Sequence, residues 1–270
     1  MDPIPISRQE WIAMHFSVLG SLAVSAHGRR SRISGRCQEA LLLTLLINEG
    51  TAVAAGTLIE ELWGPQAPRN ARNALQAHVS RLRRELHRLE PDRPEGSIVA
   101  RHGGGYRLKL APADEIDATV FMTGLRDVRS WCHSRRDEAV ARLRELLSLW
   151  CGPLSGAAVE GAMCRAAAAH YEESRLDALE LLFDLELVEN RHEAILSEVR
   201  ELAAMHPLRE RFCEQLMIAL YRSGRQVEAL DYYHRLRRRL TGELGTGPSA
   251  TLRRTAEAVL SHSPLLTVQR

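Results

Sequence analysis

The feature that most constrains this chain is an arginine-rich amphipathic segment from Pro68 to Leu89. Five apolar residues in it are spaced four, three, four and three apart, so they lie along one stripe of a 3.6-residue helix. The stripe predicts a helix that packs one face against a hydrophobic core. Its members are Leu75, Val79, Leu82, Leu86 and Leu89, and the opposite side carries Asn73, Ala77, Ser80 and Arg84.

The side of the helix opposite the stripe is basic. Between Pro68 and Leu89 six arginines stand against one acid, Glu85, a net charge of +5. Such a face can lie against phosphates, although a charged helix face is most often simply solvated. The charge distribution along the chain favours phosphate binding by the first part. Residues 1–112 carry 15 basic against 10 acidic side chains, whereas residues 113–270 carry 21 against 24, so the excess positive charge lies in the part that holds this helix.

Two shorter apolar segments precede the basic helix. A cluster of leucines from Leu41 to Leu46 predicts a first helix, and Thr57–Trp63 predicts a short second one that turns Leu58, Ile59 and Leu62 inward. Gly64-Pro65 ends the second helix, and Pro68 and Asn70 mark the start of the third. This order predicts a helix-turn-helix with a lengthened turn.

A glycine-rich hairpin follows the basic helix. From Ser97 to Leu110 apolar and polar residues alternate on either side of Gly103-Gly104-Gly105, as in a β-hairpin whose turn needs positive φ angles. By itself the run of glycines fits a flexible surface turn equally well. Directly after a basic helix, it predicts a wing, with the register of the turn left open.

These segments resemble a known family. Residues 14–110 resemble a winged helix-turn-helix of the response-regulator type, with strands that begin at His15, three helices and a final hairpin. More specific strings resemble the Streptomyces antibiotic regulatory protein family, whose members join this DNA-binding domain to a helical bacterial transcriptional activation domain. The strings are Glu60-Glu61-Leu62-Trp63-Gly64, Asn73-Ala74-Leu75-Gln76, Val79-Ser80-Arg81-Leu82-Arg83-Arg84, Leu216-Met217 and Ala219-Leu220-Tyr221-Arg222-Ser223-Gly224-Arg225.

The resemblance implies a DNA-binding surface centred on the third helix. It places Asn73, Gln76 and Ser80 in a major groove, where Asn and Gln pair well with adenine. Arginines beside them would mostly hold phosphates, and which residues read bases stays open. The expected DNA-binding residues are Arg69, Arg72, Asn73, Gln76, Ser80, Arg81, Arg83, Arg84, Arg101, His102 and Arg107.

The resemblance also implies partners. We expect a homodimer on double-stranded promoter DNA with direct repeats, and recruitment of RNA polymerase holoenzyme with its sigma factor. The turn from Trp63 to Pro68 is the candidate polymerase contact, through Gly64, Gln66 and Arg69. No cofactor or metal is expected. The implied role is activation of antibiotic or other secondary-metabolite biosynthesis.

The second half of the chain is expected to be helical throughout. Glu193-Ala194-Ile195-Leu196 recurs as Glu228-Ala229-Leu230-Asp231, 35 residues later, close to the tetratricopeptide period. Helical hairpins of this kind stack side by side because none can bury its apolar face alone. A second basic cluster, Arg235 to Arg239, is expected to be a solvated face or a partner contact. The predicted fold class is mainly α with small β.

Signatures of enzymes and of export are missing from the sequence. The single lysine, Lys109, lies in no P-loop, and no H-E-x-x-H or G-x-S-x-G motif occurs. The five cysteines are widely spaced and form no C-x-x-C pair. We therefore expect a non-enzymatic cytoplasmic protein with reduced thiols and no membrane association.

The expected organisation has five parts. They are an N-terminal extension (1–13), a winged helix-turn-helix domain (14–110), a linker (111–115), a helical activation domain (116–263) and a C-terminal tail (264–270). Two other functions remain open. The chain could be an adaptor that binds proteins through its helical repeats, or a repressor whose helical domain senses a small ligand.

Overall fold

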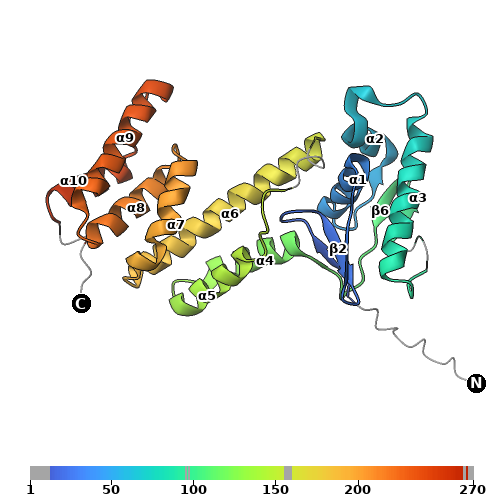
Figure 1. Ribbon diagram of the computed structural model, residues 1–270, viewed down its shortest axis with the longest axis horizontal. Helices are drawn as coiled ribbons and strands as arrows, with labels where there is room; N and C mark the ends of the chain where they lie inside the picture. Colours follow the sequence, from blue (N-terminus) through green and yellow to red (C-terminus); the bar gives the residue numbers. More distant parts are fainter. Residues whose placement is uncertain (1–12, 95, 97, 155–159, 264–265, 267–270) are drawn as a thin grey trace, which may run out of the picture. The chain divides into compact units, whose positions relative to one another are not determined.

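The structure, a computed structural model, describes residues 13–94, 96, 98–154, 160–263 and 266. Residues 1–12 of the expected N-terminal extension, Ser97 of the hairpin and all of the expected tail except Leu266 lie outside the described residues. The chain forms two compact units. The first comprises Met1–Arg129 and Glu145–Arg175, and the second comprises Ser130–Arg144 and Leu176–Arg270 (Figure 1).

The first unit begins with a four-stranded sheet in the order β3-β2-β1-β7. Its strands are β1 (His15–Ser17), β2 (Ala23–Ala26), β3 (Arg29–Arg32) and β7 (Glu115–Ile116). β7 pairs with β1 in parallel. Glu115, the last residue of the expected linker 111–115, therefore belongs to this sheet.

Asp114 holds that segment in place. Its carboxylate accepts hydrogen bonds from the backbone N–H groups of Met14 (2.9 Å) and Ala111 (2.7 Å). It also forms a bidentate ion pair with Arg93, with both side chains almost completely buried. A buried carboxylate is tolerated when its oxygens are satisfied in this way.

Three helices follow the N-terminal strands: α1 (Arg36–Ile47), α2 (Ala55–Trp63) and α3 (Ala71–Leu89). A 3₁₀ turn, η1 (Gly64–Gln66), connects α2 toward α3. The predicted apolar stripe of α3 is buried throughout, and its most exposed member, Leu89, is 6% exposed. The leucines of α1 are buried as well, so the predicted helix-turn-helix is confirmed.

The wing is a three-stranded sheet in the order β4-β6-β5, from β4 (Val53–Ala54), β5 (Val99–His102) and β6 (Gly105–Leu108). Gly103 and Gly104 have φ angles of 55° and 82°, as the two central residues of a type I′ turn require. Gly105 already belongs to β6, where a Cβ would collide with the backbone of Val53. The three glycines thus serve two purposes, and the turn register is fixed at Gly103-Gly104.

The first unit also contains most of α4 (Asp117–Trp131) and the start of α6 (Ala162–Val188). Glu61 of α2 is 5% exposed, and its carboxylate accepts hydrogen bonds from the backbone N–H groups of Met163 (2.8 Å) and Cys164 (3.3 Å). A Cβ on Gly161 would collide with this carboxylate. Glu61 therefore caps the N-terminus of α6, where free N–H groups favour a negative charge.

The second unit consists of stacked helices. It holds most of α5 (Arg136–Leu147), the rest of α6, and α7 (His192–Met205), α8 (Glu210–Arg222), α9 (Gln226–Leu244) and α10 (Ala250–Leu260). α8 packs against both α7 and α9, and α10 packs against α8 and α9. The repeated motifs at Glu193 and Glu228 lie at the starts of α7 and α9, so the tetratricopeptide-like hairpins are confirmed.

We predict that Glu61→Ala lowers the free energy of unfolding by about 1–3 kcal/mol, because it leaves the half-buried N–H group of Met163 and the buried N–H group of Cys164 without an acceptor. Glu61→Gln keeps one acceptor oxygen and should lose less. Chemical denaturation measures the change, with the exposed neighbour Glu60→Ala as the control. Equal stability of Glu61→Ala and Glu60→Ala would contradict the capping role.

Candidate nucleic-acid interface

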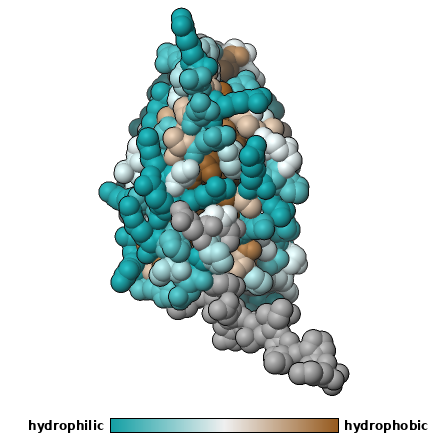
Figure 2. Space-filling view, turned by 90° about the vertical axis from the view of Figure 1, so that its right-hand side faces the viewer, coloured by the Kyte–Doolittle hydropathy of each residue, from teal (hydrophilic) through white to brown (hydrophobic). Residues whose placement is uncertain are grey.

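The rotation of α3 about its axis decides which side chains reach solvent. Because the leucine stripe is buried, the opposite face is exposed, including Asn73, Gln76 and Ser80. Figure 2 shows this side of the molecule covered mainly by hydrophilic residues. The exposed candidates are Arg69, Arg72, Asn73, Gln76, Ser80, Arg81, Arg84, Arg101 and His102, and the half-buried ones are Arg83 and Arg107.

Arg83 connects α3 to the wing. Its Nε donates a hydrogen bond of 2.9 Å to the carbonyl of Val99 at the start of β5, and its side chain lies against Gly96. The guanidinium group therefore fixes the position of the hairpin relative to the helix. The sequence pattern alone placed Arg83 on the flank of the helix and gave no sign of this structural role.

The wing presents its cations on two faces. Arg101 pairs with Tyr106 across the hairpin, whereas Arg107 pairs with Ala100 and His102 pairs with Gly105. Because side chains alternate along a strand, His102 and Arg107 share one face and Arg101 lies on the other. The Nε of Arg107 is buried and has no hydrogen-bond partner in the part of the chain that the structure describes.

A basic hollow of about 360 Å³ lies beside α3. Arg81, Arg84 and Arg88 of α3 line it together with Arg32 of β3. Arg88 pairs with Glu85 at 2.7 Å, while Arg81 and Arg84 have no acidic partner among the described residues. Arg32 was missed in the sequence analysis, although the string Arg29-Arg30-Ser31-Arg32 was a visible signal of a basic strand.

His78 fastens α3 to the two helices before it. Its ring lies 5.7 Å from that of Trp63, and Gln38 donates hydrogen bonds of 3.2 Å to its Nδ1 and to its backbone carbonyl. Burial and the charge of Arg81 lower the pKa of His78. The lowered pKa favours the neutral ring, which suits Nδ1 as an acceptor.

The turn proposed for polymerase immediately precedes α3 in the chain. Gln66 and Arg69 are exposed and Gly64 is half-buried, with a φ of 51°. Together with Trp63 and the start of α6, Gly64 and Gln66 border a hollow of about 510 Å³. Gly64 and Gln66 thus lie at the rim of this hollow, and Gln66 and Arg69 are open to solvent.

Comparisons with known proteins agree with this architecture. A family model described as "Transcriptional regulatory protein, C terminal" matches residues 35–108, and one described as "Bacterial transcriptional activator domain" matches residues 116–260. The transcriptional regulator RedD of Streptomyces coelicolor is 37% identical over 94% of this chain and 73% of its own. Regulatory protein DnrI of Streptomyces peucetius is 32% identical over 93% of each chain.

The chain belongs to the Streptomyces antibiotic regulatory protein family. A solved structure of Mycobacterium tuberculosis EmbR in complex with a low-affinity phosphopeptide has the same architecture, a winged helix-turn-helix followed by a helical domain. It matches with a TM-score of 0.83 and 28% identity over 94% of this chain and 66% of the EmbR chain.

Membership of this family makes the protein a transcriptional regulator. Its relatives carry the names of regulators and not of enzymes, which agrees with the expected class. Within the described residues, no helix combines the length and apolar character needed to cross a bilayer.

Proposed function

We propose that the protein activates transcription by inserting the exposed face of α3 into the major groove of promoter DNA. The observation that carries this proposal is the buried stripe of α3, which leaves a polar and basic face opposite. A major groove admits one α-helix, and Asn73 and Gln76 offer the amide groups that pair with adenine. The deep, narrow major groove of double-stranded RNA would not admit the helix.

The cations around α3 would hold phosphates on both sides of that groove. On one side, Arg81, Arg84 and Arg32 surround the basic hollow. On the other side, the wing carries Arg101 and His102 beside a tip that Gly103-Gly104 makes narrow, so that it can reach a minor groove or the backbone, and the half-buried Arg107 lies farther along β6. Phosphate contacts would set the register and Asn73 and Gln76 would read sequence.

The finer steps follow from the family. Two copies would bind direct repeats on one face of the duplex, with centres about one helical turn apart, roughly 10 to 10.5 base pairs, or a multiple of it. The turn at Gly64, Gln66 and Arg69 would contact RNA polymerase or its sigma factor. The regulated genes would be those of an antibiotic or other secondary-metabolite pathway.

The organisation of the chain is part of the proposal. The winged domain (14–110) would bind DNA, and the helical domain (116–263) would support dimerisation and activation. An adaptor that used only the helical domain would not need a basic face on α3. No contact among the described residues favours a ligand-sensing repressor.

The roles of Arg84 and Asn73 can be separated by their effects on specific and random DNA. Arg84→Ala should weaken binding to both and lower the salt slope by about one unit, because one phosphate contact is lost. Asn73→Ala should weaken binding to the target by about 1–3 kcal/mol and leave random DNA unaffected.

Fluorescence anisotropy over a range of salt concentrations measures both effects. Arg253→Ala, an exposed arginine on α10, is the matched control. Arg83 is unsuitable for this comparison because its loss would also release the wing. If Asn73→Ala weakened specific and random DNA equally, base reading at that position would be wrong.

The polymerase contact predicts a variant that binds DNA but fails to activate. Gln66→Ala should lower transcription from the target promoter by roughly fivefold at full occupancy, the loss of a contact worth about 1 kcal/mol. In vitro transcription with purified holoenzyme measures this, beside an affinity measurement on the same DNA. Arg69→Ala should lower both affinity and transcription. If both variants supported transcription at the wild-type level at saturating concentration, this turn would not be the polymerase contact.

A further inference from the structure

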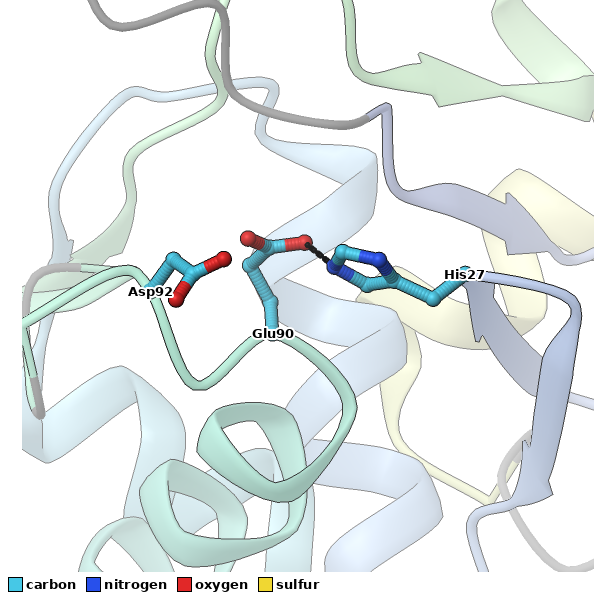
Figure 3. A group of neighbouring side chains, drawn as sticks. All are labelled: His27, Glu90 and Asp92. Carbon is cyan, nitrogen blue, oxygen red and sulfur yellow. Dashed lines mark hydrogen bonds and ion pairs between the residues drawn. The ribbon is translucent and has the colours of Figure 1, made fainter.

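Three side chains with metal-ligating atoms converge where α3 ends. His27 comes from the turn between β2 and β3, and Glu90 and Asp92 follow the last residue of α3. Figure 3 shows His27 and Asp92 approaching Glu90 from opposite sides. One ligand atom from each of the three residues lies within 4.8 Å of the other two.

The turn that carries His27 is built to present it. His27 and Gly28 have φ angles of 50° and 69°, and the flanking residues Ala26 and Arg29 pair across the hairpin. Histidine is one of the few side chains that enter this left-handed region with some frequency. The turn brings Nε2 of His27 to 2.9 Å from a carboxylate oxygen of Glu90.

The local charge favours a cation. The side chain of Glu90 is only 1% exposed, and Asp92 adds a second carboxylate from the solvent side. Arg93 is nearby, but its guanidinium group is held by both oxygens of Asp114 at 2.6 and 2.7 Å. Asp114 therefore offsets the charge of Arg93, which also attracts Glu90, and Asp92 adds a carboxylate that has no ion-pair partner among the described residues.

We propose that His27, Glu90 and Asp92 bind a divalent first-row transition-metal ion, with Zn²⁺ as the best fit. One imidazole nitrogen and two carboxylate oxygens form a donor set that suits such ions. In a tetrahedral site two ligands that each lie about 2.1 Å from the metal are about 3.4 Å apart, so the 2.9 Å between His27 and Glu90 would widen by about 0.5 Å when the ion replaces their hydrogen bond. Asp92 is exposed, and one of its carboxylate oxygens lies within 4.8 Å of the ligand atoms of His27 and Glu90.

The ion would join the β2–β3 turn to the end of α3. Asn73 is 17 residues away from Glu90, which is about 25 Å along a helix. The site is therefore separate from the face proposed to read bases, and its effect would be on the stability of the first unit. The alternative is that the hydrogen bond between His27 and Glu90 holds the turn without a metal.

The test is calorimetric titration of the untagged full chain with Zn²⁺ at pH 7.5, with Co²⁺ absorption as a second probe. His27→Asn removes the imidazole and places Asn-Gly, the most favoured pair, in the turn. Asp92→Asn removes a ligand from an exposed side chain. Both variants should fold, as thermal unfolding without metal would verify, and His102→Asn on the wing is the matched control.

We expect the wild type and His102→Asn to bind one Zn²⁺ ion with the same affinity. In His27→Asn and Asp92→Asn the affinity for Zn²⁺ should fall at least roughly tenfold. Co²⁺ should bind without a thiolate charge-transfer band, which separates this site from the free cysteines. No binding by the wild type, equal binding by all variants, or a thiolate band that accounts for all the bound metal would overturn it.

Discussion

The burial of five apolar side chains along α3 is the constraint on which the rest of this structure depends. A helix with one buried stripe has only one possible rotation about its axis, so the residues opposite are exposed whatever their chemistry. In this chain those residues are amides, a serine and arginines. The same rotation places Arg83 against β5 and brings Arg81 and Arg84 beside Arg32. The geometry of the proposed interface therefore follows from hydrophobic packing.

Buried carboxylates give the first unit its second constraint. Asp114 lies in the segment after the wing and binds the backbone of Met14 and the side chain of Arg93. Asp117 accepts hydrogen bonds from the N–H groups of Val18 and Leu19. Glu61 caps the N-terminus of α6. Each satisfies backbone donors that would otherwise be buried without a partner. The compact units of the structure differ from the regions that the two family models match. Most of α4 and the start of α6 belong to the same compact unit as the winged helix, although both lie in the region matched by the activator-domain model.

The sequence predicted the elements whose signals are local. The stripe of α3, the leucines of α1 and the repeated motif at Glu193 and Glu228 each lie within a few turns of helix. It did not predict β7 or the cap by Glu61, because their partners lie about 100 residues away and no local pattern marks them. The exposure of most candidate residues was predictable, but the tether of Arg83 was not, since it depends on where the hairpin packs. Their roles in DNA binding stay predictions.

Hydroxyl-radical footprinting of the purified protein on the DNA upstream of its own gene cluster tests the central claim most directly. The account predicts two protected segments beside a promoter, on one face of the duplex and about one helical turn, or a multiple of it, apart. Protection should follow the major groove at the centre of each segment and the flanking phosphates. No protection even at low salt, where phosphate contacts are strongest, would contradict the account and move the function to the helical domain.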